Sequence, residues 1–157
     1  MRSEVSFLVP QSPPKRLFLC PVADLDSLES AVQPSSKHFG LFLALDAVAI
    51  DVERIRRVAE KLLRRGLVYL CTWGSDCERV HDIFDEVDVR MDPEQQKPVV
   101  MTTSHSDESI EEAVWYFVNC AFSEEAYLPT CLDWIFAPVG NREWEKAIRE
   151  SWSAKAD

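Results

Sequence analysis

The feature that most constrains this fold is an alternation of short apolar, β-prone runs with amphipathic helical segments. The predicted strands are residues 17–20, 39–45, 67–70, 98–102 and 132–137. The segments that follow them carry apolar residues at helical spacing. Such alternation is typical of a parallel sheet with helices on both faces. We therefore expect a three-layer (αβα) domain, Rossmann-like or flavodoxin-like, with about five parallel strands.

Residues typical of helix ends mark where the predicted helices begin and stop. Asp51 precedes a helical segment that Gly66 closes, and Asn141 precedes the last one. Three pairs with capping-box spacing predict helices over 24–32, from 76, and over about 110–122: Asp26–Glu29, Ser75–Glu78 and Ser109–Glu112. The pattern does not fix the strand order, for which 2-1-3-4-5 is a common arrangement.

The length of 157 residues suits one domain with a sizeable core. We assign residues 16–157 to that domain and residues 1–15 to an N-terminal arm, in which residues 5–10 have the character of a short edge strand. No apolar run is long enough to cross a membrane. The N-terminus lacks the pattern of a signal peptide. We therefore expect a cytoplasmic protein that does not bind membranes.

The formal charge of −10 and the pI near 4.8 argue against nucleic-acid binding, since phosphate backbones attract basic surfaces. The same charge favours a protein partner with a basic surface. Residues 53–65 have the opposite sign, with six basic and two acidic side chains. Two interpretations stand: a solvated helix face with Glu53–Arg57 and Glu60–Arg64 ion pairs, or a patch for a phosphate or a partner.

The five cysteines favour reduced thiols, because their number is odd and Cys20, Cys71 and Cys120 lie in apolar runs. Cys77 falls near the start of a predicted helix, where the pKa of a thiol is lowered, and His81 lies one turn further on. A Cys–His nucleophile pair is one interpretation. Against it, Asp76, Glu78 and Asp82 surround the pair with negative charge.

Metal binding is another interpretation of Cys71, Cys77 and His81, with His105 as a fourth ligand. Their spacing matches no usual zinc motif, and Cys71 belongs to a strand that points it into the core. We therefore expect no metal and no cofactor.

In a parallel sheet the loops that follow the strands meet at one edge, where α/β domains place their ligand sites. The candidate ligand-binding residues there are Asp46, Thr72, Trp73, Ser75, Asp76, Cys77, Thr103, Ser104, His105, Asp107 and Asn141. Hydroxyl groups before a helix suit an anion, but ordinary capping explains the same residues. Capping does not explain His105, which we expect in a loop. Trp73 suits stacking on a base, packing against a partner, or anchoring of its own loop.

Several enzyme fingerprints are absent from the sequence. It has no G-x-G-x-x-G, no P-loop lysine motif and no G-x-S-x-G elbow, and it contains only four glycines. Dinucleotide binding through a glycine-rich loop, P-loop NTPase activity and α/β-hydrolase chemistry are therefore disfavoured. A response-regulator receiver is also disfavoured, because residues 71–73 lack its aspartate and residues 137–138 lack its lysine.

Two segments carry a resemblance to a known family. Cys71-Thr-Trp-Gly-Ser-Asp-Cys-Glu-Arg-Val-His-Asp, together with Leu132-Asp-Trp-Ile-Phe-Ala, resembles a small bacterial α/β family known only as a domain of unknown function. The resemblance covers most of residues 16–150. It implies no activity and assigns no catalytic residues.

These observations lead to two hypotheses, and they leave open whether the protein is an enzyme. The first is a non-enzymatic Rossmann-like interaction module of the bacterial cytosol, an adaptor or an immunity-type protein whose acidic face blocks a basic toxin. The alternative is an enzyme or sensor that binds a small phosphorylated or nucleotide-like ligand at the C-terminal edge of the sheet. A homodimer is a further expectation, since Trp144, Ile148 and Trp152 form a stripe suited to core packing or to a dimer face.

Overall fold

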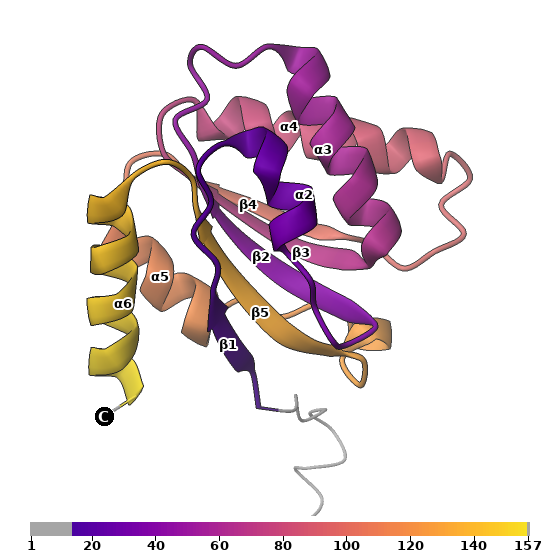
Figure 1. The fold of residues 1–157 in the computed structure, drawn as a ribbon. Helices are drawn as coiled ribbons and strands as arrows, with labels where there is room; N and C mark the ends of the chain where they lie inside the picture. The colour runs from indigo at the N-terminus through magenta and orange to yellow at the C-terminus, as the bar shows by residue number, and fades with distance from the viewer. Residues whose placement is uncertain (1–13, 157) are drawn as a thin grey trace, which may run out of the picture.

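Five parallel strands alternate with helices in the computed structural model, which describes residues 14–156, with side chains to Trp152 (Figure 1). The strands are β1 (Arg16–Leu19), β2 (His38–Ala44), β3 (Leu67–Trp73), β4 (Met101–His105) and β5 (Cys131–Pro138). The α-helices are α2 (Leu28–Ala31), α3 (Val52–Arg65), α4 (Cys77–Met91), α5 (Ile110–Asn119) and α6 (Arg142–Ala156), and the 3-10 turns are η1 (Leu25–Ser27) and η2 (Glu125–Tyr127). The predicted fold class is confirmed. The predicted edge strand at residues 5–10 lies outside the described residues.

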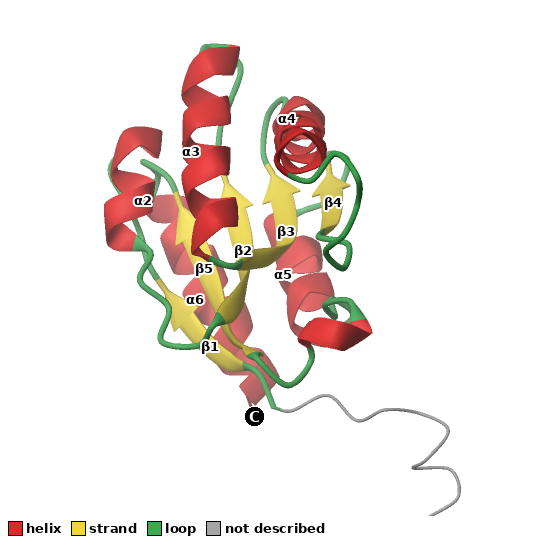
Figure 2. Ribbon diagram, turned by 90° about the vertical axis from the view of Figure 1, so that its right-hand side faces the viewer, coloured by secondary structure: helices red, strands yellow, loops and turns green. Residues whose placement is uncertain are grey.

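Helices cover both faces of the sheet, as Figures 1 and 2 show. One core lies under α2, α3 and α4 and contains Leu41, Leu43 and Ile135. The other lies under α5 and α6 and contains Phe42 and Phe136. Successive residues of a strand point to opposite faces, so an apolar run such as β2 fills both cores. Within residues 14–156, no helix combines the length and apolar character needed to cross a membrane.

The strand order is β1-β5-β2-β3-β4, and not the common order 2-1-3-4-5. β5 lies between β1 and β2 and pairs with both in parallel. The connection through α2 therefore places β1 and β2 one strand apart, and β5 lies between them. Nothing in the local sequence of β5 specifies this position, because every strand of the centre is equally apolar.

β4 begins at Met101, three residues later than predicted, and ends at His105. It is an edge strand that pairs only with β3, through residues 69–73. Its polar residues therefore belong to the strand, while the apolar Val99 precedes it and is exposed. The prediction that Thr103, Ser104 and His105 lie in a loop is wrong.

The capping predictions divide into two groups. Asp51 caps α3 through Arg54 N–H (2.9 Å), and Asn141 Oδ1 accepts from the N–H groups of Glu143 and Trp144 at the start of α6. Gly66 closes α3, and Ser109 with Glu112 forms the predicted capping box.

The other two predicted capping pairs are wrong, although both helical segments begin within one residue of the predicted start. Ser75 and Glu78 do not form a capping box, because α4 begins at Cys77 after Asp76 in the left-handed conformation. Asp24, and not Asp26, caps the η1 turn, through Ser27 N–H (2.9 Å).

α5 ends at Asn119, three residues before its predicted end. Lys15 Nζ donates to the carbonyl oxygens of Phe117 (2.6 Å) and Val118 (3.0 Å), and it lies 4.2 Å from the centre of the Trp134 ring. These carbonyls are the acceptors that a longer helix would use. The side chain therefore takes the place of a further turn.

The basic segment of α3 is largely neutralised by neighbouring acids. Arg56 pairs with Glu53 (2.6 Å) and Glu86 (2.8 Å), and Arg64 pairs with Glu60 (2.7 Å). The predicted Glu53–Arg57 pair is replaced by Glu53–Arg56. These contacts support the interpretation as a solvated helix face.

The tryptophan stripe of α6 packs on the sheet. Trp152 lies 5.6 Å from Phe136 and Trp144 lies 5.2 Å from Trp73, measured between ring centres. Core packing therefore explains the stripe.

Candidate functional site

A cavity of about 270 Å³ lies at the C-terminal edge of the sheet, between the ends of β3 and β4. We call it the edge cavity, and its lining residues are Trp73, Gly74, Ser75, Asp76, Ser106, Glu108 and Trp144. The chain leaves β3 toward α4 on one face of the sheet and leaves β4 toward α5 on the other (Figure 2). The two loops diverge, which is the arrangement that opens ligand sites in α/β sheets.

Two half-buried tryptophans form part of the cavity wall. Trp73 is the last residue of β3, and its indole Nε1–H donates to the carbonyl of Glu108 (2.9 Å). Trp144 belongs to the first turn of α6 and meets Trp73 edge to face, at an interplanar angle of 90°. Trp73 thus anchors the loop before α5, and it presents an aromatic surface to the cavity as well.

Two carboxylates of the cavity are each held through one oxygen. Asp76 Oδ2 accepts from Arg79 Nε (2.7 Å), and Arg79 also donates to the carbonyls of Ala47 and Ile50. Glu108 Oε2 lies 2.7 Å from His105 Nδ1. Among the described residues, Asp76 Oδ1 and Glu108 Oε1 have no hydrogen-bond partner. Each carboxylate is therefore fixed in place and keeps one free acceptor.

Gly74 sets the path of the loop beneath the cavity. Its φ of 117° lies in the region that side chains rarely adopt, and a Cβ there would collide with the carbonyl of Leu45. Backbone bonds from Leu45 N–H to Trp73 and from Ala47 N–H to Ser75, both 3.0 Å, hold the loop against the end of β2. The cavity floor is therefore built from fixed backbone.

His105 is 5% exposed and lies beneath α5. Its Nε2 is 3.0 Å from Thr103 Oγ1, and its ring centre is 4.7 Å from that of Tyr116. Because an ionised carboxylate only accepts, His105 Nδ1–H is the donor to Glu108. The hydroxyl of Tyr116 bonds that of Tyr69 (3.0 Å). These contacts give His105 a structural role between β4, α5 and Glu108, which the sequence did not reveal.

The order Glu108–His105–Thr103 is that of an acid, a base and a hydroxyl nucleophile. His105 is buried, and neither His105 nor Thr103 lines the edge cavity or the hollow beside α5, so this order of groups does not face either space. Burial and the bond with Tyr116 raise the pKa of Tyr69, which keeps that phenol protonated. The network joins α5 to the sheet and positions Glu108.

Cys77 and His81 do not form a nucleophile pair. Cys77 is 2% exposed, and burial raises the pKa of its thiol, which outweighs the effect of the helix start. His81 instead bonds Thr102 through Nε2 and Asp82 through Nδ1, each at 3.0 Å. Over the part of the chain that the structure describes, no group of three or more His, Cys, Asp or Glu side chains is placed to hold a metal.

The remaining sequence candidates have local structural roles or lie outside the cavity. Thr72 is buried and its hydroxyl donates to the carbonyl of Cys77 (3.0 Å), which fixes the start of α4. Asp46 is exposed and accepts from Val48 N–H within its own turn. Ser104, Asp107 and Asn141 also lie outside the cavity lining. Four cavity residues were not among the candidates: Gly74, Ser106, Glu108 and Trp144.

The surface beside the edge cavity is acidic and aromatic. A hollow of about 450 Å³ is lined by Glu108, Glu111, Glu112, Trp115 and Tyr116. Glu108 lines both spaces, so they are contiguous. Because the other four lining residues belong to α5 alone, this hollow is a groove along one helix.

About half of the acidic side chains of the chain lie at this edge, while residues 82–94 carry a further charge of −5. Residues 20–27 and 45–54 carry −2 each, residues 74–79 and 139–145 carry −1 each, and residues 106–112 carry −4. These five segments together carry −10, which is the formal charge of the whole chain, so the remaining residues sum to zero.

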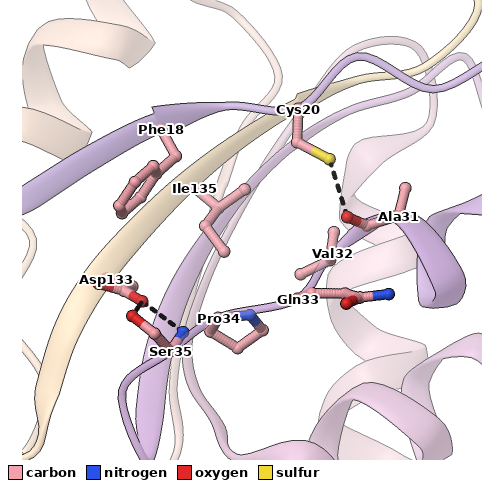
Figure 3. A pocket seen from close by; sticks show the side chains of 9 residues that line it. All are labelled: Phe18, Cys20, Ala31, Val32, Gln33, Pro34, Ser35, Asp133 and Ile135. Atoms are coloured by element: carbon pink, nitrogen blue, oxygen red, sulfur yellow. Dashed lines mark hydrogen bonds between the residues drawn. The ribbon is translucent and has the colours of Figure 1, made fainter.

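A smaller cavity of about 180 Å³ lies beside β1 (Figure 3). Its walls include Phe18, Val32 and Ile135, with the buried Asp133 at one end. Asp133 accepts from Arg16 Nε (2.7 Å) and from Ser35, so its carboxylate is already satisfied. This cavity offers mainly apolar contact, and its buried carboxylate is already engaged.

Comparison with known proteins places the chain in a family. Residues 17–155 match the family described as Domain of unknown function (DUF7684). The match spans most of the chain, so the protein belongs to this family, as the resemblance of its sequence segments suggested. No curated protein matches it.

Proposed function

We propose that this protein is a non-enzymatic interaction module of the bacterial cytosol that binds a basic protein partner at the C-terminal edge of its sheet. An adaptor or an immunity-type protein fits this description. The observation that carries the proposal is the charge distribution, since the five segments at this edge contain 13 of the 27 acidic side chains and only three basic ones. A field of one sign on one face steers and orients a partner of the opposite sign.

Helix stability explains part of this charge but not all of it. Every helix begins at this edge, and acidic side chains in the first turn are favourable there. This accounts for Asp51 at the cap of α3 and for Glu112 in the capping box of α5. It does not account for Asp107 and Glu108, which precede the Ser109 cap. We attribute this surplus charge to binding.

The alternative, a phosphorylated or nucleotide-like ligand, gains less support. Side chains of this chain cap the N-termini of α3, α5 and α6, and each cap occupies one or two of the N–H groups that an anion would use. An acidic edge also repels phosphate. The burial of Cys77 and His105 supports a binding role over catalysis.

Titration with hexalysine tests the proposal. The double variant Asp107→Asn/Glu111→Gln removes two charges from the edge, and Glu125→Gln/Glu150→Gln removes two exposed charges elsewhere. We expect the first variant to bind hexalysine about fivefold more weakly at low salt, since two exposed ion pairs of about 0.5 kcal/mol each are lost. Isothermal titration calorimetry measures the affinity.

The matched control should bind like the parent protein, and hexaglutamate should not bind at all. Equal losses in both double variants would mean that hexalysine senses only net charge. The edge would then not be the binding surface, and the proposal would fail.

A further inference from the structure

We infer that the edge cavity receives one arginine side chain of the basic partner. The inference rests on the proposed function and specifies its central contact. It commits to a protein arginine because the cavity combines an aromatic wall, two free carboxylate oxygens and a size suited to one side chain.

The volume of the cavity limits what can occupy it. Pockets for small molecules and cofactors measure about 300–1,000 Å³, and the edge cavity measures about 270 Å³. A cavity just below this range suits one side chain better than a dinucleotide. A single long side chain reaching in from a docked partner fits this space and leaves the partner's backbone outside.

The chemistry of the lining selects a cation with a flat face. Trp73 and Trp144 provide the aromatic wall, against which a guanidinium stacks. Asp76 Oδ1 and Glu108 Oε1 provide free acceptors at the same cavity. A guanidinium carries five donors in one plane, whereas an ammonium carries three on a single atom. An arginine side chain therefore stacks on the tryptophans and donates to the carboxylates at the same time.

The acceptors are fixed before the partner arrives. Arg79 holds Asp76 and is itself bonded to two backbone carbonyls of the β2–α3 loop. His105 holds Glu108 and is packed beneath α5. Fixed groups lose little conformational entropy on binding, which favours a specific contact. Arg79 and His105 are therefore positioning residues for the two carboxylates.

Three pentapeptides that differ only at the centre test the inference: Lys-Gly-Arg-Gly-Lys, Lys-Gly-Lys-Gly-Lys and Lys-Gly-citrulline-Gly-Lys. The indole N–H signals of Trp73 and Trp144, assigned in NMR spectra with Trp→Phe variants, report on the cavity. We expect the arginine peptide to shift both signals saturably. It should bind about fivefold more tightly than the lysine peptide, and the citrulline peptide should leave both signals in place.

Two variants localise the effect. Glu108→Gln should remove the preference for arginine over lysine, and Glu125→Gln should keep it. Ser106→Arg places a guanidinium of the chain itself at the cavity, so it should also abolish the preference. Circular dichroism and thermal melting confirm that each variant folds.

The outcomes separate this inference from the proposed function. If hexalysine binds at the acidic edge but arginine and lysine peptides bind equally without shifting either indole, the arginine anchor is overturned and the interaction module stands. If no basic peptide binds, both fail. If arginine amide alone binds as tightly as the peptide, the site serves a small guanidinium compound, which overturns the assignment to a protein arginine.

Discussion

Cys77 shows at the scale of a single residue how two influences on one thiol compete. Its place at the first position of α4 favours the thiolate through the helix dipole. Its burial in the core opposes ionisation and raises the pKa. The sequence revealed the first influence, because helix starts have a local signature. It did not reveal the second, because burial depends on the packing of α4 against the sheet.

We expect iodoacetamide to label Cys77 at least about tenfold more slowly than the exposed Cys120 in the native protein at neutral pH. The raised pKa of Cys77 lowers its thiolate fraction, and burial also blocks access of the reagent. Peptide mass spectrometry after timed quenching measures both rates. All five cysteines should react once guanidinium chloride unfolds the chain. Equal native rates for the two thiols would contradict the burial of Cys77 and revive its role as a nucleophile.

At the scale of elements, local signals predicted what local contacts build. Ser109 and Glu112 cap α5 as expected, since both partners lie within one turn. The similar pair Ser75 and Glu78 fails because Gly74 and Asp76 both take positive φ and turn the chain before the helix begins. The start of β4 was misplaced because an edge strand needs no apolar run. Long-range contacts, such as that of Lys15 with the carbonyl oxygen of Phe117, could not be predicted from the sequence pattern.

Asp133 joins β5 to β1 and to the segment before β2, through Arg16, Ser35 and Ser36. Burial alone raises the pKa of this carboxyl, but hydrogen bonds from the Ser35 and Ser36 N–H groups, the Ser35 hydroxyl and Arg16 outweigh it and lower the pKa. We expect Asp133→Asn to reduce the free energy of unfolding by about 3 kcal/mol at pH 7, the loss typical of breaking a buried charge pair.

The pH dependence of this loss follows from the direction of the shift. A lowered carboxyl pKa stabilises the folded state above the unfolded pKa of about 4, and the contribution disappears as the pH falls through the folded value. The difference between Asp133→Asn and the parent should therefore shrink between pH 4 and pH 2, as urea titrations would show. The exposed Asp107→Asn serves as the control. A difference that stays constant with pH would mean that the ionised form of Asp133 does not matter.

At the scale of the whole molecule, alternation alone was enough to predict a three-layer parallel fold. The edge cavity was only half predictable: Trp73, Ser75 and Asp76 follow directly from the end of β3. Trp144 enters it because β5 inserts beside β2 and sends α6 back over the same face as α5. That placement depends on strand order, which the sequence pattern leaves open. Because all five strands are parallel, the α-helices that follow them start at one edge, together with the acids near those starts.

Under the proposed function, the acids at this edge serve both folding and binding. Two alanine variants separate these two roles. Glu112 closes the capping box by accepting from Ser109 N–H (2.9 Å), whereas Asp107 is exposed and precedes the cap. We expect Glu112→Ala to lower the free energy of unfolding, because Ser109 N–H loses its acceptor in the capping box. Asp107→Ala should leave it unchanged. Each removes one charge from the edge, so both should weaken hexalysine binding about twofold at low salt.

Chemical denaturation and calorimetric titration of the two variants give the comparison. If Asp107→Ala destabilised the fold as much as Glu112→Ala, the acids before α5 would serve folding, and the surplus charge would no longer support binding. If both variants bind hexalysine equally weakly and only Glu112→Ala is less stable, then binding follows the charge of the edge while stability follows the cap. A parallel fold then supplies both properties from one set of residues, because it brings all of its helix starts to the surface that meets the partner.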